Sequence, residues 1–443
     1  MNAKTDICAP GAIDATAGPT LMDKLPALLR IAGAASLLAA MYGFLMKGWQ
    51  GGDDILRYLM LLGHTGALAA IGLASGHYLK ESKGARLLLS LALVSVPVNF
   101  AILGAFIFSQ DPLVIFGMSY PKYVAWSVDS LSTALLIAGG AALILAPIIR
   151  VGFLTLARSM SGKLAGLYLL SNAALLIPVR DPLSIGLMIL LLMLLVLFIS
   201  GKTATGQMAA KTKEGVLALG LQYLPLAILM GRSLWLYSAD LFLLTVLGLV
   251  LFITLRQISL RLIDFPRVRC TLEAVSILPA IGVGLFTAIT LNDCGFLSDL
   301  ITLPVIVLVA AGLVYEISLR AKEYVKQYRM LAAGMLVVGI SFNLYLYGGI
   351  VASSLSVATG IMLAVLGYMQ QQRAIFSSGL ALMGIGFAYQ LYSTLHLFDM
   401  YGWASLAVLG VAAILIGSTI ESKGTHIHAR LADWKAQYGE WEY

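Results

Sequence analysis

The chain has 443 residues, of which 60% are hydrophobic and only 12% are charged, and its net charge is +7. Soluble proteins carry about 25% charged residues, and no water-soluble core could bury this much apolar surface, so the composition excludes a soluble globular protein. Windows of about 20 apolar residues recur between positions 25 and 420, each long enough to cross a bilayer core of ~30 Å. The sequence therefore predicts an all-α, polytopic transmembrane helical bundle.

Residues 1–24 form the longest polar stretch and are rich in Ala, Gly, Thr and Asp. This composition is typical of a disordered tail. The stretch lacks the basic start, short apolar run and small-residue cleavage site of a signal peptide. We therefore expect a disordered cytoplasmic tail, followed by a first helix that is retained.

About fourteen helices are expected within a single transmembrane region at 25–420. The predicted spans are 25–47, 55–79, 86–108, 127–149, 163–179, 182–200, 216–236, 240–256, 273–291, 298–319, 329–348, 351–368, 374–397 and 402–420. Fourteen spans could form two halves of seven, as in transporters with inverted repeats, although the halves share no recognisable sequence.

The basic residues alternate between the two sides of these spans. Of the 29 lysines and arginines, 24 fall in the N-terminal tail, the even-numbered loops and the C-terminal tail. Lysine and arginine accumulate in cytoplasmic loops, so both termini are predicted to be cytoplasmic. The same distribution explains the positive net charge as insertion topology, and no nucleic-acid partner is expected.

Aspartates occur at or near six of the seven predicted outer helix starts. These aspartates are Asp53 and Asp54 at the first such start, and then Asp129, Asp181, Asp240, Asp299 and Asp399. Acidic residues stabilise a helix N-terminus, so capping is the favoured interpretation. The alternative is that Asp53 and Asp54, in the first external loop, serve a membrane glycosyltransferase with a lipid-linked sugar donor.

Charged residues avoid the middle third of every predicted span, and Glu273 and Glu316 are expected to reach the interface from helix ends. This pattern argues against an ion-driven carrier and against paired-carboxylate catalysis. Neutral polar residues remain at depth. They join helices by hydrogen bonds or line a substrate cavity, and the lining candidates are His64, Asn99, Asn172, Gln222 and Gln390, with Asn343 as a further buried amide.

Prolines also interrupt the predicted spans, at Pro97, Pro225, Pro279 and Pro304. Broken helices often mark the substrate sites of transporters. Pro97 and Pro225 lie close to Asn99 and Gln222, where freed backbone carbonyls could add hydrogen-bond acceptors.

No cofactor or metal site is expected, because no phosphate-binding loop or metal-ligand spacing occurs. The external loop 109–126 is the best candidate for a gate or lid. The tail 421–443 spaces apolar residues at helical intervals among charges, namely Ile427, Leu431, Trp434, Tyr438 and Trp441. We expect an amphipathic cytoplasmic helix that lies on the membrane surface or docks on a membrane-protein partner.

Two stretches carry a family resemblance: KESKGARLLLSLALVSVPVNF at 80–100 and WASLAVLGVAAILIGSTIESK at 403–423. They resemble bacterial polytopic membrane proteins whose families are known only as domains of unknown function. The resemblance implies a multi-pass protein of the bacterial inner (cytoplasmic) membrane and assigns no activity or site residues.

Three functions are compatible with these observations. The favoured one is a transporter or flippase-like bundle that handles a lipid or amphipathic substrate without ion coupling. The second is a non-catalytic subunit or scaffold of a larger membrane complex, and the third is a lipid-linked sugar transferase. A non-enzymatic role is favoured over an enzymatic one, with membrane lipids as the expected partners.

Overall fold

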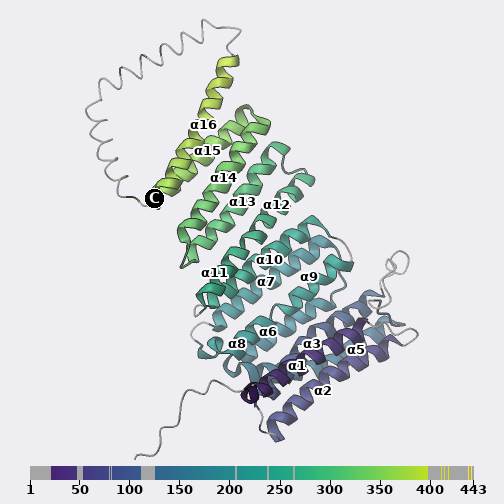
Figure 1. Cartoon of the computed structure of the whole chain (residues 1–443). Coiled ribbons are helices and arrows are strands. Elements are labelled where there is room, and N and C mark those ends of the chain that lie inside the picture. Colours follow the sequence, from purple (N-terminus) through teal and green to yellow (C-terminus); the bar gives the residue numbers. More distant parts are fainter. Residues whose placement is uncertain are drawn as a thin grey trace, which may run out of the picture. The chain divides into compact units, whose positions relative to one another are not determined.

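A computed structural model describes residues 21–46, 53–78, 80, 82–110, 125–204, 207–236, 239–262 and 265–397, with 411, 414, 418, 438 and 441 of the remaining chain. All regular structure in these ranges is helical, as predicted (Figure 1). The chain divides into two compact units, residues 1–237 and 238–443. This boundary falls between the predicted seventh and eighth spans, so each unit takes seven of them.

Unit 1 is built around one central helix, α3. Two thirds (67%) of its apolar window is buried, a larger share than in any other candidate span of the described residues. The helix packs against α1, α2, α5, α6 and α9. The helices of unit 1 are α1 (Leu21–Met46), α2 (Asp54–Tyr78), α3 (Ser82–Phe108), α5 (Leu131–Leu156), α6 (Ser161–Ala173), α7 (Pro182–Ala204), α8 (Lys213–Leu221) and α9 (Leu224–Leu236).

Unit 2 is a sequential array in which most helices pack on their neighbours in the chain (Figure 1). Its core includes Ala311, Val314, Leu336, Ile340 and Leu363. The helices of unit 2 are α10 (Leu241–Arg261), α11 (Pro266–Val275), α12 (Ile277–Asp293), α13 (Asp299–Arg320), α14 (Val325–Tyr347), α15 (Gly349–Met369) and α16 (Arg373–Leu397). Because the connections are short, consecutive membrane spans run antiparallel, and α11 and α12 together form one of these spans.

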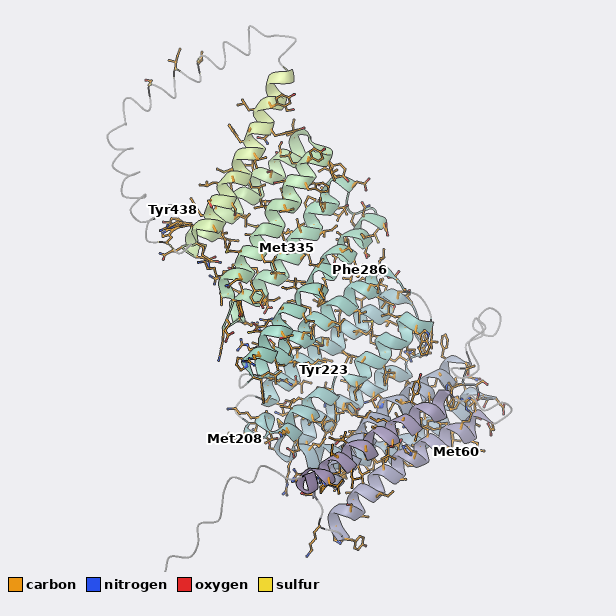
Figure 2. All side chains as sticks on the ribbon, in the orientation of Figure 1. Met60, Met208, Tyr223, Phe286, Met335 and Tyr438 are labelled. Atoms are coloured by element: carbon orange, nitrogen blue, oxygen red, sulfur yellow. The ribbon has the colours of Figure 1, made fainter. Side chains whose placement is uncertain are left out.

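Eleven helical segments of the described chain are long and apolar enough to cross a membrane. Large hydrophobic side chains project from their outer faces, as Figure 2 shows, and such surfaces are stable when lipid is the solvent. The chain is therefore a multi-pass membrane protein. In the predicted span 163–179 the α-helix α6 is only 13 residues long, and 402–420 lies almost wholly outside the described residues, so the number fourteen and the cytoplasmic termini remain predictions.

The prolines affect the helices in two ways. Pro97 and Pro304 lie inside α3 and α13, which continue through them. Pro225 and Pro279 instead occupy the first turns of α9 and α12, where a missing N–H costs no helical hydrogen bond. Two of the predicted spans are thus broken, at 222–223 between α8 and α9 and at Ser276 between α11 and α12.

Several helices that are predicted to begin on the outer side of the membrane have an N-terminal capping residue. Asp53 Oδ1 accepts a hydrogen bond from the Ile55 N–H at 2.9 Å, and Asp240 Oδ1 accepts one from the Phe242 N–H at 2.8 Å. Asp181 accepts from the Ser184 N–H, and this backbone hydrogen bond is the main reason that its pKa is lowered. At α5 the cap is Ser130 rather than the neighbouring Asp129. Capping therefore accounts for the repeated aspartates at these ends.

Candidate functional site

Asn99 joins α3 to α2 through a small polar cluster. Its Nδ2 donates to Thr65 Oγ1 at 3.0 Å and to the Ser95 carbonyl at 2.9 Å, and the hydroxyls of Thr65 and Ser95 lie 2.6 Å apart. All three residues are buried. These contacts are those of an interhelical hydrogen-bond cluster, and Pro97 leaves α3 continuous beside it.

Asn172 and Gln222 also bond locally within unit 1. Asn172 Nδ2 donates to the Tyr168 carbonyl at 2.7 Å, four residues earlier in α6. Gln222, at the break between α8 and α9, donates through Nε2 to the Leu164 carbonyl of α6 at 3.1 Å. Their amide oxygens have no hydrogen-bond partner among the described residues. Each side chain fixes a helix or joins two helices.

The remaining candidates are separated from these amides. His64 is half-buried on α2 and lines a recess with Met60 and Met41. Gln390 lies in unit 2, where its Nε2 donates to Ser354 Oγ at 3.1 Å between α16 and α15. Asn343 is fully buried on α14. The structure therefore distributes the predicted lining residues over both units, and the contacts of Asn99, Asn172, Gln222 and Gln390 favour their role as links within and between helices.

Unit 2 contains a pocket that none of these residues lines. Thirteen residues from α13, α14, α15 and the start of α16 enclose about 160 Å³. They are Leu308, Ala311, Gly312, Tyr315, Arg329, Ala332, Ala333, Leu336, Met362, Leu363, Leu366, Gln370 and Ile375. Ten of them are apolar or glycine, so most of the surface offered to a ligand is hydrocarbon.

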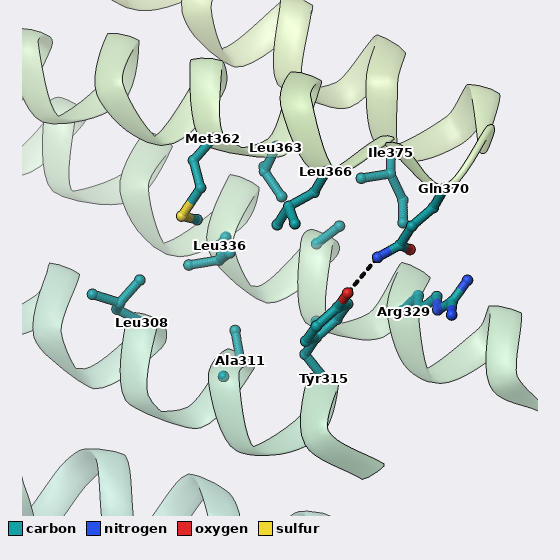
Figure 3. Close-up of a pocket in the computed structure, with 13 residues that line it drawn as sticks. Leu308, Ala311, Tyr315, Arg329, Leu336, Met362, Leu363, Leu366, Gln370 and Ile375 are labelled. Carbon is teal, nitrogen blue, oxygen red and sulfur yellow. Dashed lines mark hydrogen bonds between the residues drawn. The ribbon is translucent and has the colours of Figure 1, made fainter. Parts of the chain in front are cut away.

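The three polar lining residues gather at one end of the pocket. Figure 3 shows Tyr315, Arg329 and Gln370 together, with Leu308 and Met362 at the far end. Gln370 Nε2 donates a hydrogen bond to Tyr315 Oη. Buried atoms at this end, Arg329 Nε and Gln370 Oε1, have no hydrogen-bond partner in the described part of the chain. The pocket is thus amphipathic, with a guanidinium and a carboxamide at one end.

The size of the pocket fits part of a hydrocarbon chain. A cavity of about 150 Å³ accommodates benzene, so 160 Å³ holds an apolar segment of similar bulk. The pocket also opens sideways, because Leu308 is 51% exposed and Met362 is 36% exposed. Their helices are candidate membrane spans, so this opening faces the lipid environment.

Each of the three long helices contributes an apolar stripe that ends in one polar residue. On α13, Leu308 and Ala311 precede Tyr315, and on α15, Met362 and Leu366 precede Gln370. On α14 the order is reversed, with Arg329 first, because this helix runs antiparallel to the others. The polar residue lies at the same end each time. This spacing is the signal that the sequence carries for the pocket, but the sequence alone does not distinguish Arg329 from the other basic residues of the predicted cytoplasmic loops.

A partly buried ion-pair cluster joins α13 to α10 and α11. It consists of Arg256 on α10, Arg269 and Glu273 on α11, and Glu316 and Arg320 on α13. Glu273 Oε1 accepts a hydrogen bond from Arg269 Nε at 2.9 Å, and Arg256 Nε donates to Glu316 Oε2 at 3.0 Å. The cluster connects three helices.

This position corrects the expectation for Glu273. The residue was expected to reach the interface from the end of a span, but it is only 1% exposed. The reason is that the chain forms a separate helix, α11, before the break at Ser276, and the two arginines supply a counter-charge that allows the carboxylate to be buried.

The two aspartates of the first external loop both have structural contacts. Asp53 caps α2, as described above. Asp54 binds Arg57 through Oδ1 at 2.8 Å and accepts a hydrogen bond from the Ser127 N–H through Oδ2 at 3.0 Å. Arg57 in turn lies over the Trp126 ring at 4.1 Å. Asp54 thus links α2 to the segment that precedes α5.

Two aromatic residues of the C-terminal tail contact unit 2. Trp441 packs edge-on against Tyr368 and Phe376, each with ring centroids 5.5 Å apart, and it is 8% exposed. Arg373 lies over the Tyr438 ring, and Figure 2 shows Tyr438 beside the start of α16. The tail therefore docks on its own chain through these residues; most of 421–443, like 111–124 of the predicted lid, lies outside the described residues.

Comparison with known proteins assigns no family, since no family model, curated protein or solved structure matches the chain. The resemblance of 80–100 and 403–423 to uncharacterised bacterial membrane proteins thus remains a prediction. Within the described ranges, no group of three or more His, Cys, Asp or Glu side chains is placed to hold a metal ion. The amphipathic pocket of unit 2 is accordingly the candidate functional site.

Proposed function

We propose that this membrane protein is a transporter or flippase-like bundle that takes a lipid or other amphiphile into the pocket of unit 2. The observation that carries the proposal is the combination of an apolar pocket, an opening on a lipid-facing surface and one polar end. A soluble substrate would need polar contacts along its length, whereas an acyl chain needs only hydrocarbon contact.

The lining residues support binding rather than catalysis. None of the thirteen is a carboxylate, histidine, cysteine, serine or lysine, the side chains that most often act as nucleophiles or general acids and bases. No carboxylate is available in the pocket for a coupling ion either. A passive or partner-driven movement of an amphiphile therefore suits the pocket better than ion-coupled transport.

The predicted orientation gives the pocket a position in the bilayer. Tyr315, Arg329 and Gln370 lie near the helix ends that the distribution of basic residues assigns to the cytoplasm. Arg329 and Leu336 are separated by seven residues of α14, or about 10 Å. Half of a ~30 Å hydrocarbon core is ~15 Å. In a bacterial inner membrane with cytoplasmic termini, the pocket would lie within the inner leaflet.

The two alternatives rest on less. The role of a non-catalytic subunit is suggested by a C-terminal tail that could dock on a partner. Tyr438 and Trp441 of this tail instead pack against residues of their own chain. A sugar transferase was motivated by Asp53 and Asp54, whose carboxylates bind Ile55, Arg57 and Ser127. Both residues thus have a structural function that is independent of any substrate.

A lipid-translocation assay tests the proposal. The protein is reconstituted in liposomes that contain a lipid with a fluorescent headgroup, and a membrane-impermeant reductant measures the fraction that becomes accessible. Gly312→Leu fills the pocket at a position where an added Cβ meets no atom within 4 Å. Gly384→Leu is the matched control, since its Cβ also meets none and it lies outside the pocket on α16.

We expect translocation by the wild type and by Gly384→Leu, and a loss with Gly312→Leu. If liposomes with each of the three proteins, the wild type included, show the same rate as protein-free liposomes, translocation is refuted. Equal rates in the three proteins, above the rate without protein, would show that lipid moves by a route outside this pocket.

A further inference from the structure

Arg329 differs from the buried arginines of this chain in its partners. Arg256 and Arg269 face Glu273, and Arg57 pairs with Asp54. Among the described residues Arg329 has no carboxylate partner, although it is half-buried and its Nε is shielded from solvent. A cation in such a position lacks the counter-charge that normally compensates its desolvation. The polar end of the pocket is thus suited to receive an anion.

The neighbouring groups present further hydrogen-bonding capacity to that anion. Tyr315 Oη accepts a hydrogen bond from Gln370, so the O–H of Tyr315 is left to donate in another direction. Arg329 contributes a planar set of N–H donors, the geometry that suits phosphate and carboxylate oxygens. Two donors of different helices, α13 and α14, therefore lie at the polar end of an apolar pocket.

The pocket beyond this position is suited to one acyl segment. The lining between the polar end and Leu308 is Ala311, Ala332, Leu336, Leu363 and Leu366 with their neighbours, and it offers hydrocarbon only. A free inorganic anion would leave this surface unused, and a lipid without net charge would offer Arg329 either no phosphate or a phosphate whose charge is offset by its own ammonium group. A molecule that has both an anionic head and an acyl chain satisfies both ends.

We propose that the pocket selects an anionic glycerophospholipid, with the headgroup phosphate on Arg329 and Tyr315 and part of one acyl chain along α13, α14 and α15. This inference deepens the proposed function and rests on it, because it names the substrate class of the same pocket. The lipid reaches the pocket through the lateral opening at Leu308 and Met362.

Photolabelling tests the selection. The full-length protein is placed in phosphatidylcholine vesicles with a trace of phosphatidylglycerol or phosphatidylcholine carrying a diazirine in one acyl chain, and labelled peptides are mapped by mass spectrometry. We expect phosphatidylglycerol to label the peptides of Leu336, Leu363 and Leu366 about tenfold more than phosphatidylcholine, because the choline ammonium of phosphatidylcholine offsets the phosphate charge that Arg329 attracts.

Four variants separate charge from shape. Arg329→Gln should reduce labelling by phosphatidylglycerol about tenfold, to the level of phosphatidylcholine, while Arg329→Lys should keep part of the preference. Lys322→Gln removes an exposed charge from the loop before α14 without touching the pocket, and it should change nothing. Gly312→Leu should reduce labelling by both lipids.

The outcomes distinguish this inference from the proposed function. If Arg329→Gln leaves the preference intact while Gly312→Leu removes the label, anionic selection is refuted and the lipid pocket stands. If Gly312→Leu leaves the label unchanged, the pocket is not the lipid site and both proposals fail. If excess glycerol 3-phosphate displaces the label, the site recognises the soluble headgroup, and selection of an intact phospholipid is refuted.

Discussion

Tyr315 and Glu316 are adjacent on α13 but belong to different polar sites. The Tyr315 hydroxyl accepts a hydrogen bond from Gln370 at the amphipathic pocket, whereas Glu316 binds Arg256 at 3.0 Å in the ion-pair cluster. On the next helix the neighbouring residues also differ, because Arg329 lines the pocket whereas Tyr328 is buried in the core cluster that includes Phe252 of α10. The cluster and the polar end of the pocket therefore share one turn of α13, and the cluster ties this pocket-lining helix to α10 and α11.

Removal of the Glu273 charge should destabilise unit 2 strongly. Glu273→Gln keeps the side-chain volume but leaves Arg256 and Arg269 buried without their shared carboxylate. Breaking a buried ion pair from one side costs about 3–5 kcal/mol. We expect a melting temperature in detergent well below that of the wild type. Glu214→Gln is the control, because Glu214 and its partner Arg86 are 37% and 44% exposed and such surface pairs contribute below about 1 kcal/mol. Equal effects of the two changes would contradict this assignment.

The close approach of α15 and α16 should depend on glycine. A Cβ added at Gly360 would lie 2.6 Å from the Met383 nitrogen, so the two helices can pack this closely only without a side chain there. We expect Gly360→Ala to lower the free energy of unfolding by about 1–3 kcal/mol. Gly384→Ala adds a Cβ that meets no atom within 4 Å, so it should be neutral or stabilise the helix by up to about 1 kcal/mol. Thermal unfolding would show opposite shifts; parallel shifts would contradict the packing argument.

The fold class and most helix positions could be predicted because a helix that crosses a lipid bilayer needs a long run of apolar residues, which is visible in the sequence. The break at Ser276 could not, since the predicted span 273–291 runs across it and leaves the charged residues before it in a loop. The burial of Glu273 follows from this break and from two arginines distant in sequence. A single sequence shows that a glutamate lies near a helix end, but not which guanidiniums the fold brings to it.

The candidate site was missed for a related reason. The polar residues predicted at membrane depth include Asn99 and Gln222, whose hydrogen bonds join their helices to neighbouring ones. The polar residues of the pocket lie near helix ends, where Arg329 looks like any other cytoplasmic basic residue. Only the packing of three helices shows that Arg329, Tyr315 and Gln370 belong to one cavity.

Asn99→Ala tests whether the unit 1 amides are structural. Its loss removes the hydrogen bond to Thr65 but leaves the contact between Thr65 and Ser95 in place. Interhelical hydrogen bonds in membranes contribute about 0.6 kcal/mol on average, so we expect a loss of about 1 kcal/mol in stability and unchanged lipid translocation. Asn172→Ala, which removes a bond within α6 alone, is the comparison. Normal stability with lost translocation in Asn99→Ala would instead support its role as a cavity-lining residue.

Trp441→Ala should release the C-terminal tail without unfolding unit 2. Trp441 makes edge-on contacts with Tyr368 and Phe376, and each such aromatic pair contributes about 1 kcal/mol. A total of about 2 kcal/mol corresponds to a roughly 30-fold larger population of the released tail. Trypsin cleavage after Lys435, followed by mass spectrometry of the folded protein, should accelerate by a similar factor, because proteolysis follows the open population when closing is fast.

Trp235→Ala, at a tryptophan that is 67% exposed, should leave this cleavage unchanged. Because Tyr438 and Trp441 pack against their own chain, a membrane partner could bind these two residues only after such release. Equal cleavage of the wild type and of Trp441→Ala would contradict this, because it would show that these residues are already free to bind a partner.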